Sequence, residues 1–287
     1  MSKDKTREII AGYIKKYSYI KLLDNPKRFI PCAMNIGIKK AKGDIIIRMD
    51  AHTLYIKSFI SRSVAYLLKY KADNVGGIWI TKPGADTLVA RAIALSLSHP
   101  FGVGNSYFRI GTKKPRLADA VAFGCYWKRM FKKIGLFNEK MLRSEDIELN
   151  MRIKKTGGKI YLIPTIMGYY YAKPTLKSFL KHNFINGIWV TYPLKFGKKP
   201  FHLRHAIPLL FVLSLIISGI LSVFFQVFLW IFLFIAIPYF LFNIYFSIKI
   251  AKREKKIGYF FVLSMSFMCL HIGYGFGSLW GLIKLIL

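Results

Sequence analysis

The amino-acid sequence predicts an α/β domain with a mostly parallel, Rossmann-like sheet, followed by α-helical segments that cross a membrane. Strand-like and helix-like patterns alternate between residues 19 and 163, which is typical of strands joined by helical crossovers. Two apolar runs, 206–250 and 257–287, far exceed the roughly 20 residues that a membrane span needs. We therefore expect three parts: an α/β domain at 1–173, an interfacial helix with a basic linker at 174–205, and a membrane domain at 206–287.

Short β-branched runs give the expected strands, and runs with a helical apolar stripe give the expected helices. The strands are expected at 19–23, 45–49, 74–81, 119–126 and 159–163, the last stopped by Pro164. The helices are expected at 4–17, 31–42, 56–70, 86–98, 128–134 and 145–156. Pro31 suits the first turn of its helix, and Gly43 and Gly135 suit helix ends. The irregular segment 99–117 is of a length that is usually functional or mobile.

The strand at 45–49 runs directly into Asp50-Ala51-His52. Alternate residues of an extended chain point the same way, so Asp50 and His52 are expected to face one point beyond the strand's carboxyl end. Ligands of open α/β sheets bind at that edge. A carboxylate with an imidazole suits a divalent ion, and a divalent ion suits a diphosphate. The alternative is a strand end whose polar residues are simply solvated.

A second polar stretch is Arg143-Ser144-Glu145-Asp146-Ile147-Glu148. Ser144 is a plausible N-cap, acids in a first helical turn suit the helix dipole, and Glu148 can pair with Arg152 four residues later. These facts alone explain the acids as the start of a helix, so the residues by themselves leave a catalytic role open.

The formal net charge of +32 implies anionic partners. No recognised nucleic-acid motif accompanies the charge, and the apolar runs favour phosphorylated substrates and membrane lipids over nucleic acid. The three cysteines lack metal-type spacing and are expected to be reduced packing residues.

Three spans fit the apolar runs, at 206–225, 228–248 and 258–283. The basic loop 252–256 between the second and third is expected to be cytoplasmic, together with the basic α/β domain. This topology describes a multi-pass protein of the cell membrane whose C-terminus leaves on the far side. The aromatic and basic segment 175–189 is either a helix in the membrane interface or an ordinary helix packed on the α/β domain.

Several motifs in order along the chain now identify a family. They are Ser2-Lys3-Asp4-Lys5-Thr6, Asn35-Ile36-Gly37 with Ala41-Lys42-Gly43-Asp44, Asp50-Ala51-His52, Phe123-Gly124, Ile134-Gly135-Leu136-Phe137 and Ser144-Glu145-Asp146. In their order and spacing the chain resembles the inverting family 2 glycosyltransferases with the GT-A fold, in particular their membrane-attached, polysaccharide-building members. Asp50-Ala51-His52 takes the place of the family's Asp-x-Asp.

The resemblance implies transfer of a sugar from a nucleotide-sugar donor to a lipid-linked or saccharide acceptor, with inversion. It assigns Asp50 and His52 to a Mn²⁺ or Mg²⁺ ion, Asp50 and Arg143 to the donor, and Glu145 and Gly124 to the acceptor. Asp146 becomes the general base that takes the proton of the acceptor hydroxyl.

The sequence departs from the family in two places. His52 replaces the second acid of Asp-x-Asp, and imidazole suits Mg²⁺ less well than carboxylate does. The family's first strand should precede Ser2, so the glycosyltransferase domain is expected to be N-terminally incomplete. The alternative function is therefore a truncated, inactive relative that acts as an interaction subunit in the membrane.

Overall fold

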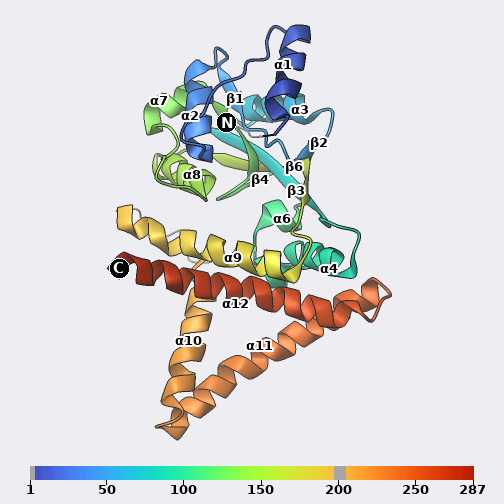
Figure 1. Cartoon of the computed structure of the whole chain (residues 1–287), viewed down its shortest axis with the longest axis vertical. Helices are drawn as coiled ribbons and strands as arrows, with labels where there is room; N and C mark the ends of the chain where they lie inside the picture. Colours follow the sequence, from blue (N-terminus) through green and yellow to red (C-terminus); the bar gives the residue numbers. More distant parts are fainter. Residues whose placement is uncertain (1–3, 197–204) are drawn as a thin grey trace.

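The computed structural model describes residues 4–196 and 205–287. Residues 2–3 of the Ser2–Thr6 motif and residues 197–204 of the predicted linker lie outside the described residues. Figure 1 shows an α/β domain at one end of the molecule and a group of long helices at the other, with α9 between them.

A six-stranded sheet forms the centre of the α/β domain, with the order β1-β5-β3-β6-β2 and β4 paired to β6. The strands are β1 (Ile45–Ile47), β2 (Leu54–Tyr55), β3 (Asn74–Lys82), β4 (Arg116–Leu117), β5 (Ala122–Trp127) and β6 (Ile160–Tyr171). The sheet is mixed: β3 and β6 form its long parallel pair, and β5 runs antiparallel between β1 and β3. Consequently β1, β3 and β6 share one direction, and this parallel core is what the helical crossovers of the sequence predict.

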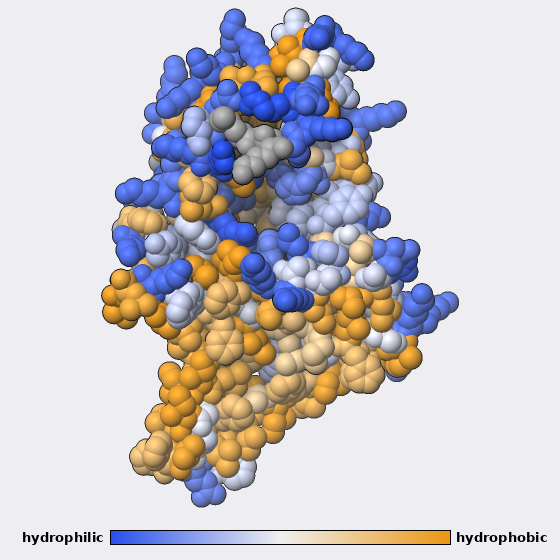
Figure 2. Space-filling model, in the orientation of Figure 1, coloured by the Kyte–Doolittle hydropathy of each residue, from blue (hydrophilic) through white to orange (hydrophobic). Residues whose placement is uncertain are grey.

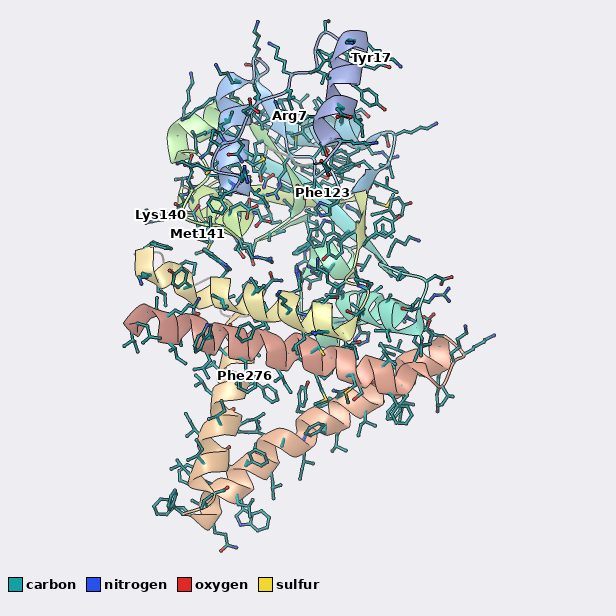
Figure 3. The ribbon with its side chains drawn as sticks, viewed as in Figure 1. Arg7, Tyr17, Phe123, Lys140, Met141 and Phe276 are labelled. Atoms are coloured by element: carbon teal, nitrogen blue, oxygen red, sulfur yellow. The ribbon has the colours of Figure 1, made fainter. Side chains whose placement is uncertain are left out.

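Helices cover both faces of the sheet. On one face, α2 (Ile30–Lys40), α7 (Lys128–Ile134) and α8 (Glu145–Lys155) bury Ile38, Phe131 and Leu149 against the sheet. On the other face, α3 (Phe59–Lys69) buries Phe59 and Leu67 together with Phe123, which Figure 3 places at the centre of the domain. Two apolar layers of this kind stabilise an α/β sheet by removing both of its faces from water.

The strand predicted to stop at Pro164 continues to Tyr171. The register between β3 and β6 shifts between Gly76 and Ile78, so the proline lies in an irregular stretch that makes no regular ladder pairs. A Cβ on Gly77 would overlap the carbonyl oxygen of Ile166, and only glycine permits this approach. Gly77 thus allows β6 to lie close to β3 at Ile166, just after the irregular stretch.

The strand predicted at 19–23 is wrong, since this segment is irregular and pairs with no strand among the described residues. Its Tyr19 side chain is 79% exposed. The neighbouring helix α1 (Thr6–Lys16) buries none of its residues, although its apolar stripe is present. An extended chain forms a strand only where a ladder partner is available, and sequence pattern does not show whether one is.

The remaining helices connect the domain to the apolar part of the chain. They are α4 (Leu88–Leu97), α5 (Pro100–Val103), α6 (Tyr107–Ile110), α9 (Leu176–Thr191), the 3₁₀ helix η1 (Tyr192–Phe196), α10 (Ile207–Leu221), α11 (Gln226–Arg253) and α12 (Tyr259–Ile286). In Figure 1, α10, α11 and α12 form the three sides of a triangle, and α12 is the side that lies along α9.

The three membrane spans stay a prediction. Among the described residues, α11 and α12 are long and apolar enough to cross a membrane, judged by length and composition alone. Helix α10 has 15 residues, which gives a length of about 22 Å, shorter than the roughly 30 Å of a bilayer core.

Glycines fix the position of α12. Gly273, Gly277 and Gly281 recur every fourth residue, and a Cβ on either of the last two would overlap backbone or side-chain atoms of α9. Such small-residue stripes let helix backbones approach closely in apolar surroundings. The first turns of α12 pack against α4, where Leu263 and Ala92 share one apolar cluster. Helix α12 therefore lies along α9 and against α4, beside the α/β domain (Figure 1), and the exit of the C-terminus to the far side of a membrane stays a prediction.

Candidate active site

The predicted metal strand is present as β1, but the residues after it form a turn. The Thr53 N–H donates to the Asp50 carbonyl over 3.1 Å, and the Asp50 N–H donates to the Tyr55 hydroxyl over 2.6 Å. Because the chain turns here, the expected alternation of side chains does not operate. His52 is exposed, whereas Asp50 is partly buried.

Arg48 lies at the centre of the site. Its Nε donates to Asp50 Oδ1 over 3.0 Å, and its Nη1 donates to Glu145 Oε1 over 2.8 Å. The guanidinium is only 15% exposed, and Glu145 is 6% exposed. One buried cation thus joins the acid predicted on the donor side to an acid predicted on the acceptor side, although 97 residues separate Arg48 from Glu145 in the chain.

The charges of this group depend on one another. Burial would lower the pKa of Arg48, but the carboxylates of Asp146, Glu145 and Asp50 outweigh burial and raise it. Burial and the neighbouring charge of Asp146 raise the pKa of Glu145, and Arg48 opposes this shift. Arg48 is therefore a permanent cation that allows several acids to remain close together in a poorly solvated place.

The acids of the second motif stand at the start of α8. Ser144 is the residue before the helix, but its side chain makes no capping bond, and its backbone is left-handed with φ of 57°. Strained backbone of this kind is frequent where a side chain must be aimed. Asp146 Oδ1 accepts a hydrogen bond from the Ile147 N–H over 2.9 Å. Simple capping by Ser144 is therefore an incomplete account of this motif.

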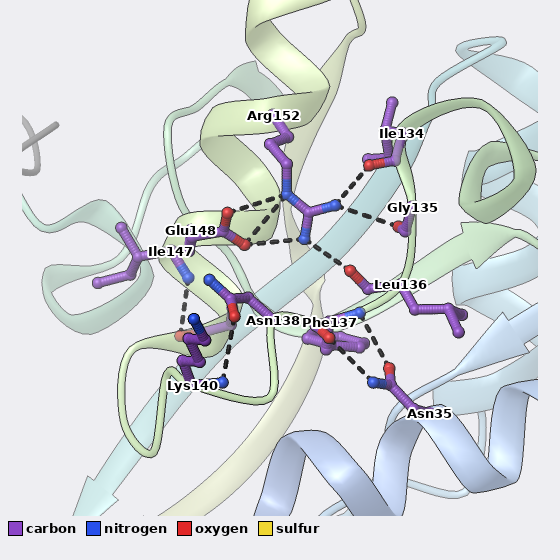
Figure 4. Close-up of polar contacts among 11 residues, drawn as sticks. Asn35, Ile134, Gly135, Leu136, Phe137, Asn138, Lys140, Ile147, Glu148 and Arg152 are labelled. Carbon is purple, nitrogen blue, oxygen red and sulfur yellow. Dashed lines mark hydrogen bonds and ion pairs between the residues drawn. The ribbon is translucent and has the colours of Figure 1, made fainter. Parts of the chain in front are cut away.

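Two side chains, Arg152 and Asn35, hold the loop before α8 through hydrogen bonds to its backbone (Figure 4). Arg152 forms the predicted pair with Glu148 and also donates to the carbonyls of Ile134, Gly135 and Leu136. The Asn35 amide donates to the Phe137 carbonyl and accepts from the Phe137 N–H, each over 2.9 Å. The Asn-x-Gly motif of α2 therefore holds the Gly-Leu-Phe turn of the acceptor side.

We expect Arg152→Lys to lower the unfolding temperature by about 5–10 °C. An ammonium cannot bind a carboxylate and three carbonyls at once, and losing several such bonds costs about 2–4 kcal/mol. Thermal unfolding followed by tryptophan fluorescence measures the change. Arg62→Lys is the matched control, because within residues 4–196 and 205–287 Arg62 makes one hydrogen bond, to the Thr165 carbonyl. Equal shifts in the two variants would contradict the assigned role of Arg152.

The same loop rests on α9. Met141, fully buried, packs with Val190 of α9, and Figure 3 places Met141 between the domain and that helix. The Arg143 Nη1 donates to Asn186 Oδ1 over 2.9 Å. Arg143 was predicted to bind the donor, yet its contact is with the helix beside the apolar part of the molecule.

Gly124 has a packing role in β5. It is buried, its carbonyl accepts from the Arg48 N–H over 3.0 Å, and a Cβ here would overlap the Tyr126 side chain. Its contact with an acceptor stays a prediction.

Sequence reasoning missed Arg48, although a signal was present. A charged residue inside an apolar strand, two positions before the acid, shares a face with that acid when the strand is extended. Asn35 was seen only as a motif residue, because its partner Phe137 is 102 residues away.

A divalent ion would be held by Asp50. Arg48 engages Oδ1, and among the described residues no hydrogen bond reaches Oδ2, so this oxygen is the ligand atom left for a metal. The described residues contain no cluster of three or more His, Cys, Asp or Glu side chains suited to a metal. Mg²⁺ commonly binds one or two carboxylates and completes its shell with substrate phosphates, so a site built on Asp50 fits such an ion.

Comparisons with known proteins identify the family. Residues 1–135 match the family model described as Glycosyl transferase family 2. The chain is 30% identical over 223 residues to a dolichyl N-acetyl-alpha-D-glucosaminyl phosphate 3-beta-D-2,3-diacetamido-2,3-dideoxy-beta-D-glucuronosyltransferase of Methanococcus voltae, covering 75% of this chain and 68% of that enzyme. It is also 30% identical over 210 residues to the succinoglycan biosynthesis protein ExoA of Rhizobium meliloti strain 1021, covering 67% of this chain and 63% of that protein.

Among solved structures, the mannosyltransferase PcManGT from Pyrobaculum calidifontis, in complex with GDP-Man and Mn²⁺, aligns with a TM-score of 0.56. The alignment covers 97% of this chain and 75% of that one at 13% identity, which shows the fold: a GT-A-like domain followed by apolar helices. The match to the family model and the relative matched over 75% of the chain show that the chain belongs to glycosyltransferase family 2.

Proposed function

We propose that this protein transfers a sugar from a nucleotide-sugar donor to a lipid-linked or polysaccharide acceptor, with inversion, at a membrane. The observation that carries the proposal is the Arg48 guanidinium, which binds Asp50 and Glu145 and lies close enough to Asp146 for that carboxylate to raise its pKa. In this proposal one acid serves the departing diphosphate and another serves the attacking acceptor hydroxyl in a displacement at the anomeric carbon.

In this proposal Asp146 is the general base. It takes the proton from the acceptor hydroxyl as the oxygen attacks, a step that needs a carboxylate within hydrogen-bond reach. Glu145 orients the acceptor or the base, and Arg48 fixes Glu145 while balancing the charge of its neighbours. Asp50, with His52 as a second candidate ligand, would hold Mn²⁺ or Mg²⁺, which neutralises charge on the departing diphosphate when bound.

The relatives supply the substrate classes. One relative is a glucuronosyltransferase that acts on a dolichyl N-acetyl-glucosaminyl phosphate, the other is a succinoglycan biosynthesis protein, and PcManGT was solved with GDP-Man and Mn²⁺. We carry over the shared chemistry, a nucleotide-sugar and an acceptor on a lipid or a growing polysaccharide. The alternative, an inactive interaction subunit, is favoured by no feature of the described residues.

The direct test uses purified protein in lipid nanodiscs with a panel of radiolabelled nucleotide-sugars and Mn²⁺ or Mg²⁺. Extracted lipids of a polysaccharide-producing cell serve as acceptors. We expect one donor to label the lipid fraction and to release its nucleoside diphosphate, and both signals to vanish with EDTA. Absence of labelling with every donor, in well-folded protein, would favour the interaction subunit.

The apolar helices are proposed to attach the enzyme to the cell membrane with the catalytic domain in the cytoplasm. Figure 2 shows hydrophilic residues over the α/β domain and hydrophobic residues over α10, α11 and α12. The turn between α10 and α11 is apolar, and its Val223 and Phe224 are 79% and 72% exposed. In this arrangement the α10–α11 hairpin enters the bilayer, while α12 and α9 lie near its cytoplasmic surface, beside the basic residues 252–256.

This arrangement predicts where the C-terminus lies. A cysteine added after Leu287 should react with a membrane-impermeant maleimide only when the cytoplasmic side is accessible, as in inverted vesicles. The reason is that Gly281 of α12 is in contact with Thr191 and Ile188 of α9, on the catalytic side. Labelling of this cysteine in intact cells would instead support the topology with three spans, in which the C-terminus lies outside the cell. A cysteine at Lys113, in an exposed loop of the α/β domain, is the matched control.

A further inference from the structure

Four cationic or imidazole side chains lie near one another, since the charges of three of them act on the fourth, a histidine of α9. They are Arg109 of α6, Arg143 before α8, Lys173 after β6 and His182 of α9. Among the described residues, no carboxylate lies within ion-pair distance of Arg109, Arg143 or Lys173. Arg48 is bonded to two carboxylates, whereas these three cations have no carboxylate partner among the described residues.

Arg109 is the most informative of the four. Its guanidinium stacks 4.5 Å from the Trp79 ring, and Trp79 stacks in turn on Tyr170 with ring centroids 4.6 Å apart. Its Nη1 is sealed from solvent and has no hydrogen-bond partner in the described part of the chain. Buried polar groups almost always have partners, so this N–H is a donor for which the described residues supply no acceptor.

The pKa of His182 shows the effect of the positive charges around it. Burial and the charges of Arg143, Lys173 and Arg109 lower its pKa to about 4, so the imidazole is neutral at physiological pH. A neutral imidazole still offers one N–H donor. His182 lies one helical turn before Asn186, which holds Arg143, so the two side chains share a face of α9.

The position of these four residues favours binding of the acceptor over binding of the donor. Arg143 is two residues from Glu145 and three from Asp146, and it is bonded to α9 rather than to Asp50. The other side of α9 packs on the glycines of α12, and α12 presents Phe276 on the face opposite α9 (Figure 3). A ligand here would have its anionic group between the catalytic acids and the apolar helices.

We infer that Arg109, Arg143, Lys173 and His182 bind the phosphate or diphosphate that joins the acceptor sugar to its lipid. The inference rests on the proposed function, and it narrows the acceptor to a lipid-linked phosphate. The sugar hydroxyl would reach Asp146, and the lipid chain would leave along the apolar helices. Arginine and lysine recognise phosphate through charge-assisted hydrogen bonds, which are about twice as strong as neutral ones.

Binding of short prenyl probes to the full chain in nanodiscs tests the inference. Farnesyl phosphate and farnesol share a chain and differ in the phosphate, and Trp79 fluorescence provides a local signal. We expect farnesyl phosphate to bind about 10- to 100-fold more tightly than farnesol, and Arg109→Gln or Arg143→Gln to remove most of that difference. Arg143 is partly exposed, so its variant is expected to fold normally even if Arg109→Gln does not.

Arg116→Gln is the matched control. Arg116 also stacks on an aromatic ring, 3.5 Å from Tyr107, and has a buried unpaired Nε, but it lines a separate cavity of about 280 Å³ with Lys154 and Lys159. Its variant should retain the preference for farnesyl phosphate. Loss of the preference in Arg116→Gln as well would overturn the assignment to the four residues.

A third arm separates the two possible sources of phosphate. UDP and GDP should not displace farnesyl phosphate, because the donor diphosphate is expected at Asp50. Competitive displacement would assign the cluster to the donor and overturn the inference. The assay requires no sugar transfer, so a lack of transferase activity would count against the proposed function alone.

Discussion

Asp146→Asn is expected to lower the turnover number by about 100-fold or more while the fold and the affinity for nucleotide-sugar stay unchanged. The amide retains the size of the carboxylate and its Oδ1 still accepts from the Ile147 N–H, so the start of α8 is preserved. The lost function is acceptance of a proton from the attacking hydroxyl. Steady-state transfer by the variant in nanodiscs measures the effect.

The control for this substitution is Asp86→Asn. Asp86 pairs with Arg91 on the surface and its side chain is 85% exposed. Its loss should leave transfer within about twofold of the wild type, since exposed ion pairs contribute about 0–1 kcal/mol. Near-normal turnover of Asp146→Asn would move the proton transfer to another group, with Glu145 the first to examine.

Asp50→Asn is expected to reduce transfer by a similar factor of about 100 and to raise the metal concentration needed for half-maximal activity. The amide oxygen can still accept from Arg48 Nε, so the contact that organises the site is retained and the loss reports on the missing charge. EDTA should abolish wild-type transfer, and Mn²⁺ or Mg²⁺ should restore it.

Two further variants sharpen the metal experiment. Asp44→Asn removes an exposed acid at the start of the same strand and should leave the metal requirement unchanged. His52→Ala decides whether the exposed imidazole is a ligand, because a ligand's removal should shift the metal requirement in the same direction as Asp50→Asn. Unchanged metal dependence in Asp50→Asn would show that this acid does not hold the ion.

Local pattern was sufficient for those parts of the fold in which neighbours in sequence decide the outcome. The apolar strand before Asp50, the Glu148–Arg152 pair and the helix that begins at Glu145 follow from spacing alone. The strand expected at 19–23 is wrong because a strand also needs a partner, and the continuation of β6 beyond Pro164 depends on Gly77 of a different strand, which gives room to the backbone of Ile166.

The site itself depends on contacts between distant parts of the chain. Arg48 meets Glu145, Asn35 meets Phe137, and Arg143 meets Asn186, and no local pattern shows these pairings. Helix α12 combines two local signals. Its hydropathy is that of a candidate membrane span, and its glycine spacing indicates close packing on another helix, which in the structure is α9.

The anomeric configuration of the product tests the central claim most directly. A single displacement assisted by Asp146 must invert the anomeric carbon, whereas a covalent glycosyl-enzyme intermediate would retain its configuration. With the donor identified by the nanodisc panel, NMR of the transferred sugar reports the configuration through its anomeric proton coupling. The account predicts a product of opposite configuration to the donor sugar. A product with the donor's configuration would contradict it.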